Sequence, residues 1–167
     1  MGLFDRAGLS RGDFTSLSAA APGRVRVLAW ASSADGPVVG LVDRLAWSTT
    51  DGWRFVGWHE IASGGWDVTS GTLRWTLVTG GTENLLLDDP GSLPELFRER
   101  VDASIVVQQR VALAEDLAAL IVARRLLDDD TAPLIWSLNR QGESWDAAQE
   151  AQAGAELARL QAEYDIS

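Results

Sequence analysis

The chain has 167 residues and a formal net charge of −10, and 46% of its residues are hydrophobic. This length and composition suit one globular domain with its own core and exclude global disorder. The sequence contains neither cysteine nor lysine, which excludes disulfides, thiolate nucleophiles, cysteine metal sites and lysine Schiff bases. The negative charge disfavours binding to nucleic acid and to anionic membranes.

Residues 1–23 show neither a targeting signal nor a regular element. Asp5, Arg6, Arg11 and Asp13 interrupt its apolar residues before they reach the length of a signal peptide. No segment of the chain reaches the roughly 18 apolar residues of a membrane-spanning helix. We therefore expect a cytoplasmic protein whose residues 1–23 form a flexible arm.

Short stretches of alternating apolar and polar residues follow, separated by turn residues at 32–37 and 49–52. In the stretch 72–78, Leu73 and Trp75 alternate with polar residues, which predicts a strand with one buried face. Short strands at this spacing predict an antiparallel sheet, curled into a sandwich or a partly open barrel. The expected strands cover residues 24–31, 38–42, 45–48, 53–58, 66–68, 72–78 and 83–87.

A helix is expected after the last of these strands. Residues 92–95 (Ser-Leu-Pro-Glu) form a capping box with proline in the first turn. Leu93, Phe97 and Val101 then recur at helical spacing. We expect this helix to run to about Gln109 and to complete a domain of residues 24–110.

The remaining residues, 111–167, are expected to form an extension packed on the same domain. Residues 111–127 favour a helix by propensity, but the stretches 119–126 and 133–138 also suit the two strands of a hairpin. We favour the hairpin. Ser144 is placed to cap a final amphipathic helix. The apolar stripe of this helix contains Ala153, Leu157, Leu160 and Tyr164.

Several strands followed by one closing helix is the plan of pleckstrin-homology-like (PH-like) domains. Residues 38–45 (Val-Val-Gly-Leu-Val-Asp-Arg-Leu) resemble a hairpin of bacterial PH-like and GRAM-like domains. Residues 58–61 (Trp-His-Glu-Ile) and 71–75 (Gly-Thr-Leu-Arg-Trp) resemble the segments that follow that hairpin. Residues 27–30 and 100–107 resemble a group of uncharacterised actinobacterial proteins with this plan.

The resemblance covers residues 24–111 and implies an α+β fold, a PH-like partly open barrel or sandwich closed by a helix. It implies binding of lipids, peptides or proteins without naming one of them, since one fold serves many functions. Phosphoinositide-binding PH domains place several basic residues around the first turn. Here that turn, residues 32–37, contains only the charge of Asp35.

Catalysis would depend on the single histidine, His59, which is flanked by Glu60. A hydrolase needs a nucleophile and an oxyanion hole beside such a base. Adjacent residues of a strand also point to opposite faces, which separates His59 from Glu60. A single histidine with scattered carboxylates does not suit a zinc site. We therefore identify no catalytic, metal-binding or cofactor-binding residue.

The eight tryptophans suggest a binding surface. Trp53 and Trp58 have opposite parity, so we expect one of them at a surface, where tryptophan favours protein contacts. The candidate partner-binding surface consists of Trp53, Arg54, Trp58 and Arg74. The sequence thus predicts a non-catalytic binding or assembly module with an unknown protein partner. Binding to a lipid surface is the alternative, and a hydrolase using His59 is the third hypothesis.

Self-association follows from the final helix. A helix of this length is marginal in water unless its apolar stripe is covered. Either the sheet of the same chain or a second copy of the chain covers this stripe. A dimer with two-fold symmetry is the commonest assembly of identical chains. We therefore predict a homodimer.

Overall fold

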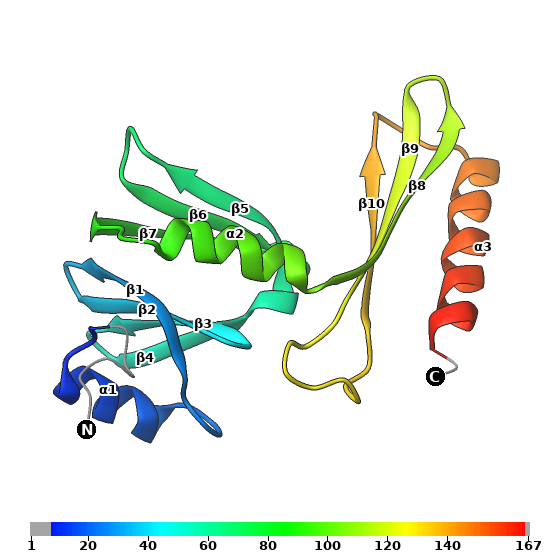
Figure 1. Cartoon of the computed structure of the whole chain (residues 1–167). Coiled ribbons are helices and arrows are strands. Elements are labelled where there is room, and N and C mark those ends of the chain that lie inside the picture. Colours follow the sequence, from blue (N-terminus) through cyan, green and yellow to red (C-terminus); the bar gives the residue numbers. More distant parts are fainter. Residues whose placement is uncertain (1–7, 166–167) are drawn as a thin grey trace. The chain divides into compact units, whose positions relative to one another are not determined.

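The chain divides into two compact units, Met1–Ala103 and Ser104–Ser167 (Figure 1). The computed structural model describes residues 8–165 of them. Among these residues both sheets are antiparallel and helices accompany each sheet, so the predicted α+β class is confirmed. No helix of the described residues is long and apolar enough to cross a membrane.

The described part of the first unit contains a seven-stranded sheet in the order β4-β3-β2-β1-β7-β6-β5. Its strands are β1 (Val27–Ser33), β2 (Gly36–Leu41), β3 (Arg44–Thr49), β4 (Gly52–Gly57), β5 (Ile61–Asp67), β6 (Thr72–Leu77) and β7 (Thr82–Asp89). Strand β1 pairs with β7 only at Ser32 and Ser33, so the sheet bends there into two meanders. Strands β4 and β5 are the two edges, and the sheet is therefore not a closed barrel.

Helix α2 (Leu93–Ala103) packs against both meanders, contacting β5 as well as β1 and β2 (Figure 1). Its Leu93, Phe97 and Val101 are buried, as the helical spacing predicts. Phe97 lies 5.8 Å from Trp58 and 6.1 Å from Trp75, measured between ring centroids. These aromatic rings form the centre of the core of the first unit.

The predicted extension of this helix to Gln109 is wrong. The helix ends at Ala103, and the strand β8 (Ile105–Ala114) begins two residues later. Residues 105–107 (Ile-Val-Val) are β-branched and favour a strand. Along β8, buried or half-buried residues alternate with exposed ones, as expected for a strand with one covered face.

The prediction of a flexible arm at residues 1–23 is also wrong for most of residues 8–23, the part that the structure describes. Helix α1 (Arg11–Ala20) begins at Ser10, whose Oγ accepts a hydrogen bond from the Asp13 N–H at 3.1 Å. Leu17 is completely buried in a cluster with Val39 and Ala46. The helix therefore covers the outer face of the β1–β4 meander. Residues 1–7 lie outside the described residues.

The second unit is a three-stranded sheet, in the order β10-β9-β8, with one helix. Strand β9 (Leu117–Arg124) pairs with β10 (Ile135–Gln141), which confirms the hairpin and excludes the helical alternative. Helix α3 (Ala147–Tyr164) begins at Asp146, two residues after the predicted cap. Its Leu160 is buried among residues of β8 and β9, and its Tyr164 ring meets Trp136 edge-on at 6.4 Å.

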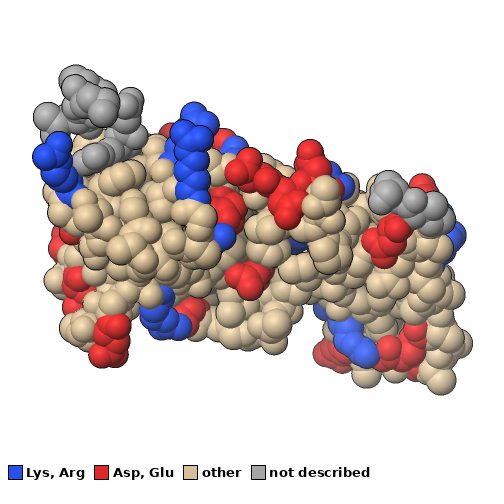
Figure 2. Space-filling view, turned by 90° about the horizontal axis from the view of Figure 1, so that it is seen from below, with Lys and Arg blue, Asp and Glu red and all other residues tan. Residues whose placement is uncertain are grey.

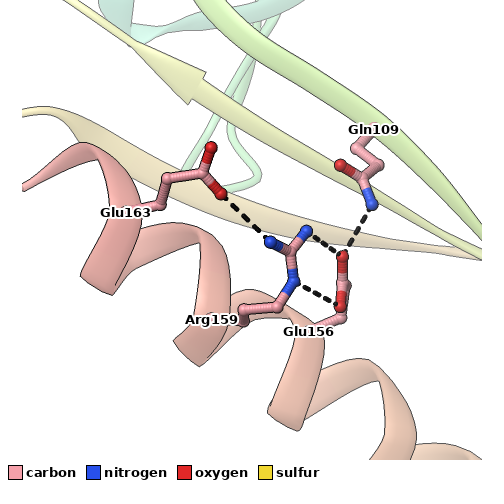
Figure 3. A network of polar contacts seen from close by, with 4 residues as sticks. All are labelled: Gln109, Glu156, Arg159 and Glu163. Carbon is pink, nitrogen blue, oxygen red and sulfur yellow. Dashed lines mark hydrogen bonds and ion pairs between the residues drawn. The ribbon is translucent and has the colours of Figure 1, made fainter.

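A polar network also ties α3 to β8 (Figure 3). The Gln109 side chain donates to Glu156 at 2.7 Å, and Arg159 donates to both Glu156 and Glu163. Helix α3 therefore docks on the sheet of its own unit. The predicted homodimer stays a prediction, but the apolar stripe of this helix no longer argues for it.

Candidate functional site

Trp58 is not exposed at the surface of the protein. It lies in a short 3₁₀ turn (Trp58–Glu60), is completely buried, and donates from Nε1 to the Leu41 carbonyl at 2.9 Å. Its place in the predicted partner-binding surface is therefore wrong. Trp58 continues the inward-facing positions of β4 and packs against Phe97 in the aromatic core.

Trp53 lies on the opposite face, as the parity predicts, but it is not an exposed anchor. Its half-buried ring packs in the cluster beneath α1, and Nε1 donates to Ser16 Oγ at 2.9 Å. The N-terminal helix thus covers the apolar area that the sequence suggests for a partner.

The two arginines of the predicted surface point to different faces of the first unit. Arg54 stands opposite Trp47 on the inner face, with its guanidinium 5.3 Å from the Trp47 ring and 3.3 Å from Glu83 of β7. Arg74 precedes the buried Trp75 and therefore lies on the outer face of β6. The structure does not bring the four predicted residues together.

A shallow groove of about 320 Å³ crosses the outer side of the β5–β6 hairpin. Residues 63–67 of β5 line it together with Thr72, Arg74, Trp75 and Thr76 of β6. Of the predicted surface, only Arg74 contributes. The expected strands 53–58 and 66–68 leave Ser63, Gly64 and Gly65 unassigned, whereas these residues line the groove.

Two adjacent residues of β5 lack side chains, and only one of them leaves the groove open. A Cβ on Gly64 would lie 2.6 Å from the Arg74 carbonyl oxygen and 2.8 Å from Phe97 Cζ. Gly64 therefore lets α2 approach the strand. A Cβ on Gly65 would meet nothing within 4 Å, so this residue forms the open floor of the groove.

One cation and one anion lie at the groove. The Arg74 Nε donates to Asn84 Oδ1 at 2.7 Å, which holds the guanidinium on the outer face. Asp67 accepts hydrogen bonds from the Ser70 N–H at 3.3 Å and the Thr69 N–H at 2.9 Å. These bonds, led by those from Ser70, lower the pKa of the Asp67 carboxyl group and keep it negative.

The edge beside the groove is open. Strand β5 has no second neighbour among the described residues, and Ser63, Gly64 and Gly65 are exposed. In an antiparallel sheet, every second residue of an edge strand directs its N–H and C=O outward. Two apolar side chains are exposed near the turn of this hairpin, Val68 at 82% and Leu86 at 62%.

His59 lies away from this groove, between Gly57 and Glu60. Its Nδ1 is buried and has no hydrogen-bond partner among the described residues. Burial lowers the pKa of His59, although the carboxylates of Glu60 and Asp43 act in the opposite direction. Glu60 accepts instead from the Gly57 N–H at 2.7 Å.

Charged side chains of both signs are interspersed over the face of the molecule shown in Figure 2. Comparisons with protein-family models, with curated proteins and with solved structures found no match to this chain.

Proposed function

We propose that the chain is a non-catalytic protein-binding module with a PH-like fold, and that the β5–β6 groove receives an extended segment of a partner protein. The fold proposal is supported by the element order of the first unit. A four-stranded meander is followed by a three-stranded meander, and then by a helix that contacts both. That is the order expected for the PH-like plan.

The observation that supports binding is the open edge of β5 directly beside the groove. An unpaired edge offers a row of backbone donors and acceptors to another extended chain. Natural edge strands are protected by lysine, proline, bulges or a covering element. The register of β5 shifts near its start, between Ile61 and Ser63. The exposed residues that follow, Ser63-Gly64-Gly65, have no charge or proline. The edge is thus open to a partner strand.

The alternative prediction, binding to a lipid surface, has less support. Arg74 and Asp67 give the groove charges of opposite sign, and the net charge of the chain is −10. An anionic bilayer gains little from such a surface. We therefore propose a segment of a protein, and not a lipid surface, as the partner.

The experiment is selection of linear peptides from a displayed random library, carried out on the full chain and on its Gly65→Thr variant. Threonine at position 65 fills the floor of the groove without a clash, because a Cβ there meets nothing within 4 Å. Gly81→Thr in the β6–β7 turn is the matched control, since a Cβ there lies 3.5 Å from Leu77.

We expect peptides that bind the unaltered chain and the Gly81→Thr variant and lose most of their affinity for Gly65→Thr. Peptides that bind all three equally would place the site elsewhere. Failure to select any peptide would also refute the proposal.

A further inference from the structure

We propose that the segment received by β5 binds antiparallel to it, with a basic, an apolar and an acidic residue in succession from N- to C-terminus. This inference rests on the proposed function and adds the chemistry of the partner. It follows from the alternation of β5 and from the two charges beside its open edge.

The register determines which partner residues face the charges. Gly65 stands opposite Arg74, and Asp67 stands opposite Thr72. Gly65 and Asp67 are two residues apart and therefore face the same, outer side of the sheet, whereas Trp66 faces the other side. A strand added antiparallel to β5 places three successive residues opposite Asp67, then Trp66, then Gly65.

The residue opposite Gly65 is predicted to be acidic. Neighbouring strands lie about 4.8 Å apart, so the added strand lies roughly 10 Å from β6. Gly65 has no side chain between them. By releasing the hydrogen bond from its Nε to Asn84 of β7, the Arg74 side chain can extend across this position toward the partner. A carboxylate there suits the planar guanidinium better than the Asn84 amide does.

The residue opposite Asp67 is predicted to be basic. Asp67 is exposed and belongs to β5 itself, so its carboxylate lies directly beside the added strand. Opposite charges in directly facing positions stabilise a strand pair. One oxygen of Asp67 already accepts two N–H groups of the turn, and the second oxygen is oriented by that arrangement.

The residue between them is predicted to be apolar, because it shares its face with the half-buried ring of Trp66. Apolar–aromatic pairs are among the favourable cross-strand neighbours.

A second copy of this chain fits these positions poorly. A two-fold antiparallel pair of β5 strands centred on Gly65 places Ser63 of one copy opposite Asp67 of the other. Asp67 then gains no basic partner, so the charges favour a segment of a different protein. Antiparallel pairing itself continues the pattern of this sheet, in which the described neighbouring strands are all antiparallel.

The test measures fluorescence anisotropy of three labelled peptides with identical threonine-rich flanks and different centres: Arg-Val-Glu, the reversed Glu-Val-Arg, and the neutral Gln-Val-Gln. They are titrated with the full chain and with its Arg74→Gln and Asp67→Asn variants. Asparagine preserves the Oδ1 acceptor of the turn and removes the charge.

We expect Arg-Val-Glu to bind tightest. Each variant should weaken its binding by about two- to fivefold, and should weaken the binding of Gln-Val-Gln by a smaller factor. Added salt should reduce the difference between the peptides.

Equal binding of the three peptides, all sensitive to Gly65→Thr, would overturn the charge pattern and leave the proposed function standing. A preference for Glu-Val-Arg would overturn the antiparallel orientation. Binding insensitive to Gly65→Thr, or no binding, would overturn both proposals. If the molecular mass in solution doubled with rising concentration for the unaltered chain but not for Gly65→Thr, the edge of β5 would bind a second copy of this chain, and both proposals would be overturned.

Discussion

Two adjacent glycines of β5 have opposite constraints. Gly64→Ala should lower the free energy of unfolding by about 1–3 kcal/mol, because its Cβ would overlap the Arg74 carbonyl oxygen and Phe97. Gly65→Ala should leave it unchanged or raise it by up to about 1 kcal/mol, since alanine restricts the unfolded chain and meets open space. Urea denaturation of both variants measures the contrast, and equal effects would contradict the described position of α2.

His59 should make stability depend on pH. Burial lowers its pKa from the ordinary 6.5, so the unfolded chain binds this proton more readily than the folded chain. The stability due to neutral His59 is complete above pH 6.5 and is lost as the pH falls from there toward the lowered pKa.

Denaturation at pH 7.5 and pH 5.5 should therefore show a smaller loss of stability in His59→Gln than in the unaltered chain. Equal losses in the two proteins would show that the imidazole is not buried in its neutral form.

Helix α1 tests how the first unit is covered. Leu17→Ala should lower the free energy of unfolding by about 2–5 kcal/mol, because the Leu17 side chain of α1 is fully buried against the sheet. Ser18→Ala on the exposed side of the same helix should change it by less than about 0.5 kcal/mol. Thermal unfolding followed by tryptophan fluorescence measures both variants. If Leu17→Ala left the stability unchanged, residues 11–20 would not be packed on the sheet, and the flexible arm predicted from the sequence would be correct.

Helix α3 is held mainly by its apolar residues. Leu160→Ala should lower the free energy of unfolding by about 2–5 kcal/mol, because its side chain is buried among residues of β8 and β9. Arg159→Ala should cost much less, since its ion pairs are exposed to solvent. Amide exchange in β8 reports both variants, and a larger effect of Arg159→Ala would mean that the polar network holds the helix.

Elements with a local signature could be predicted from the sequence. The β9–β10 hairpin follows from two apolar stretches around Asp128-Asp129-Asp130, and the start of α2 follows from Ser92 and Pro94. Helix α1 was missed although Ser10 and Asp13 form a recognisable cap, because Phe14 and Leu17 are few apolar residues for an isolated helix. What makes α1 stable is the sheet face that it covers, and a local pattern does not include that face.

The candidate site depends on the whole molecule and was therefore predicted only in part. Arg74 was selected from the sequence, but Gly64 and Gly65 matter because of what lies next to them. Gly64 is required by Phe97, which is 33 positions away in the chain. Trp53 and Trp58 were selected for opposite parity, which is correct, but α1 covers one and α2 the other. Exposure of a residue is decided by such distant contacts.

Amide hydrogen exchange with residue resolution, on the full chain with and without a selected peptide, tests the central claim most directly. The account predicts slower exchange at alternate residues of the exposed part of β5, residues 63–67, where outward N–H groups gain a partner strand. The other edge strand, β4, should exchange unchanged. Slower exchange in β4, or elsewhere with β5 unaffected, would contradict the assignment of the groove and its edge as the binding site.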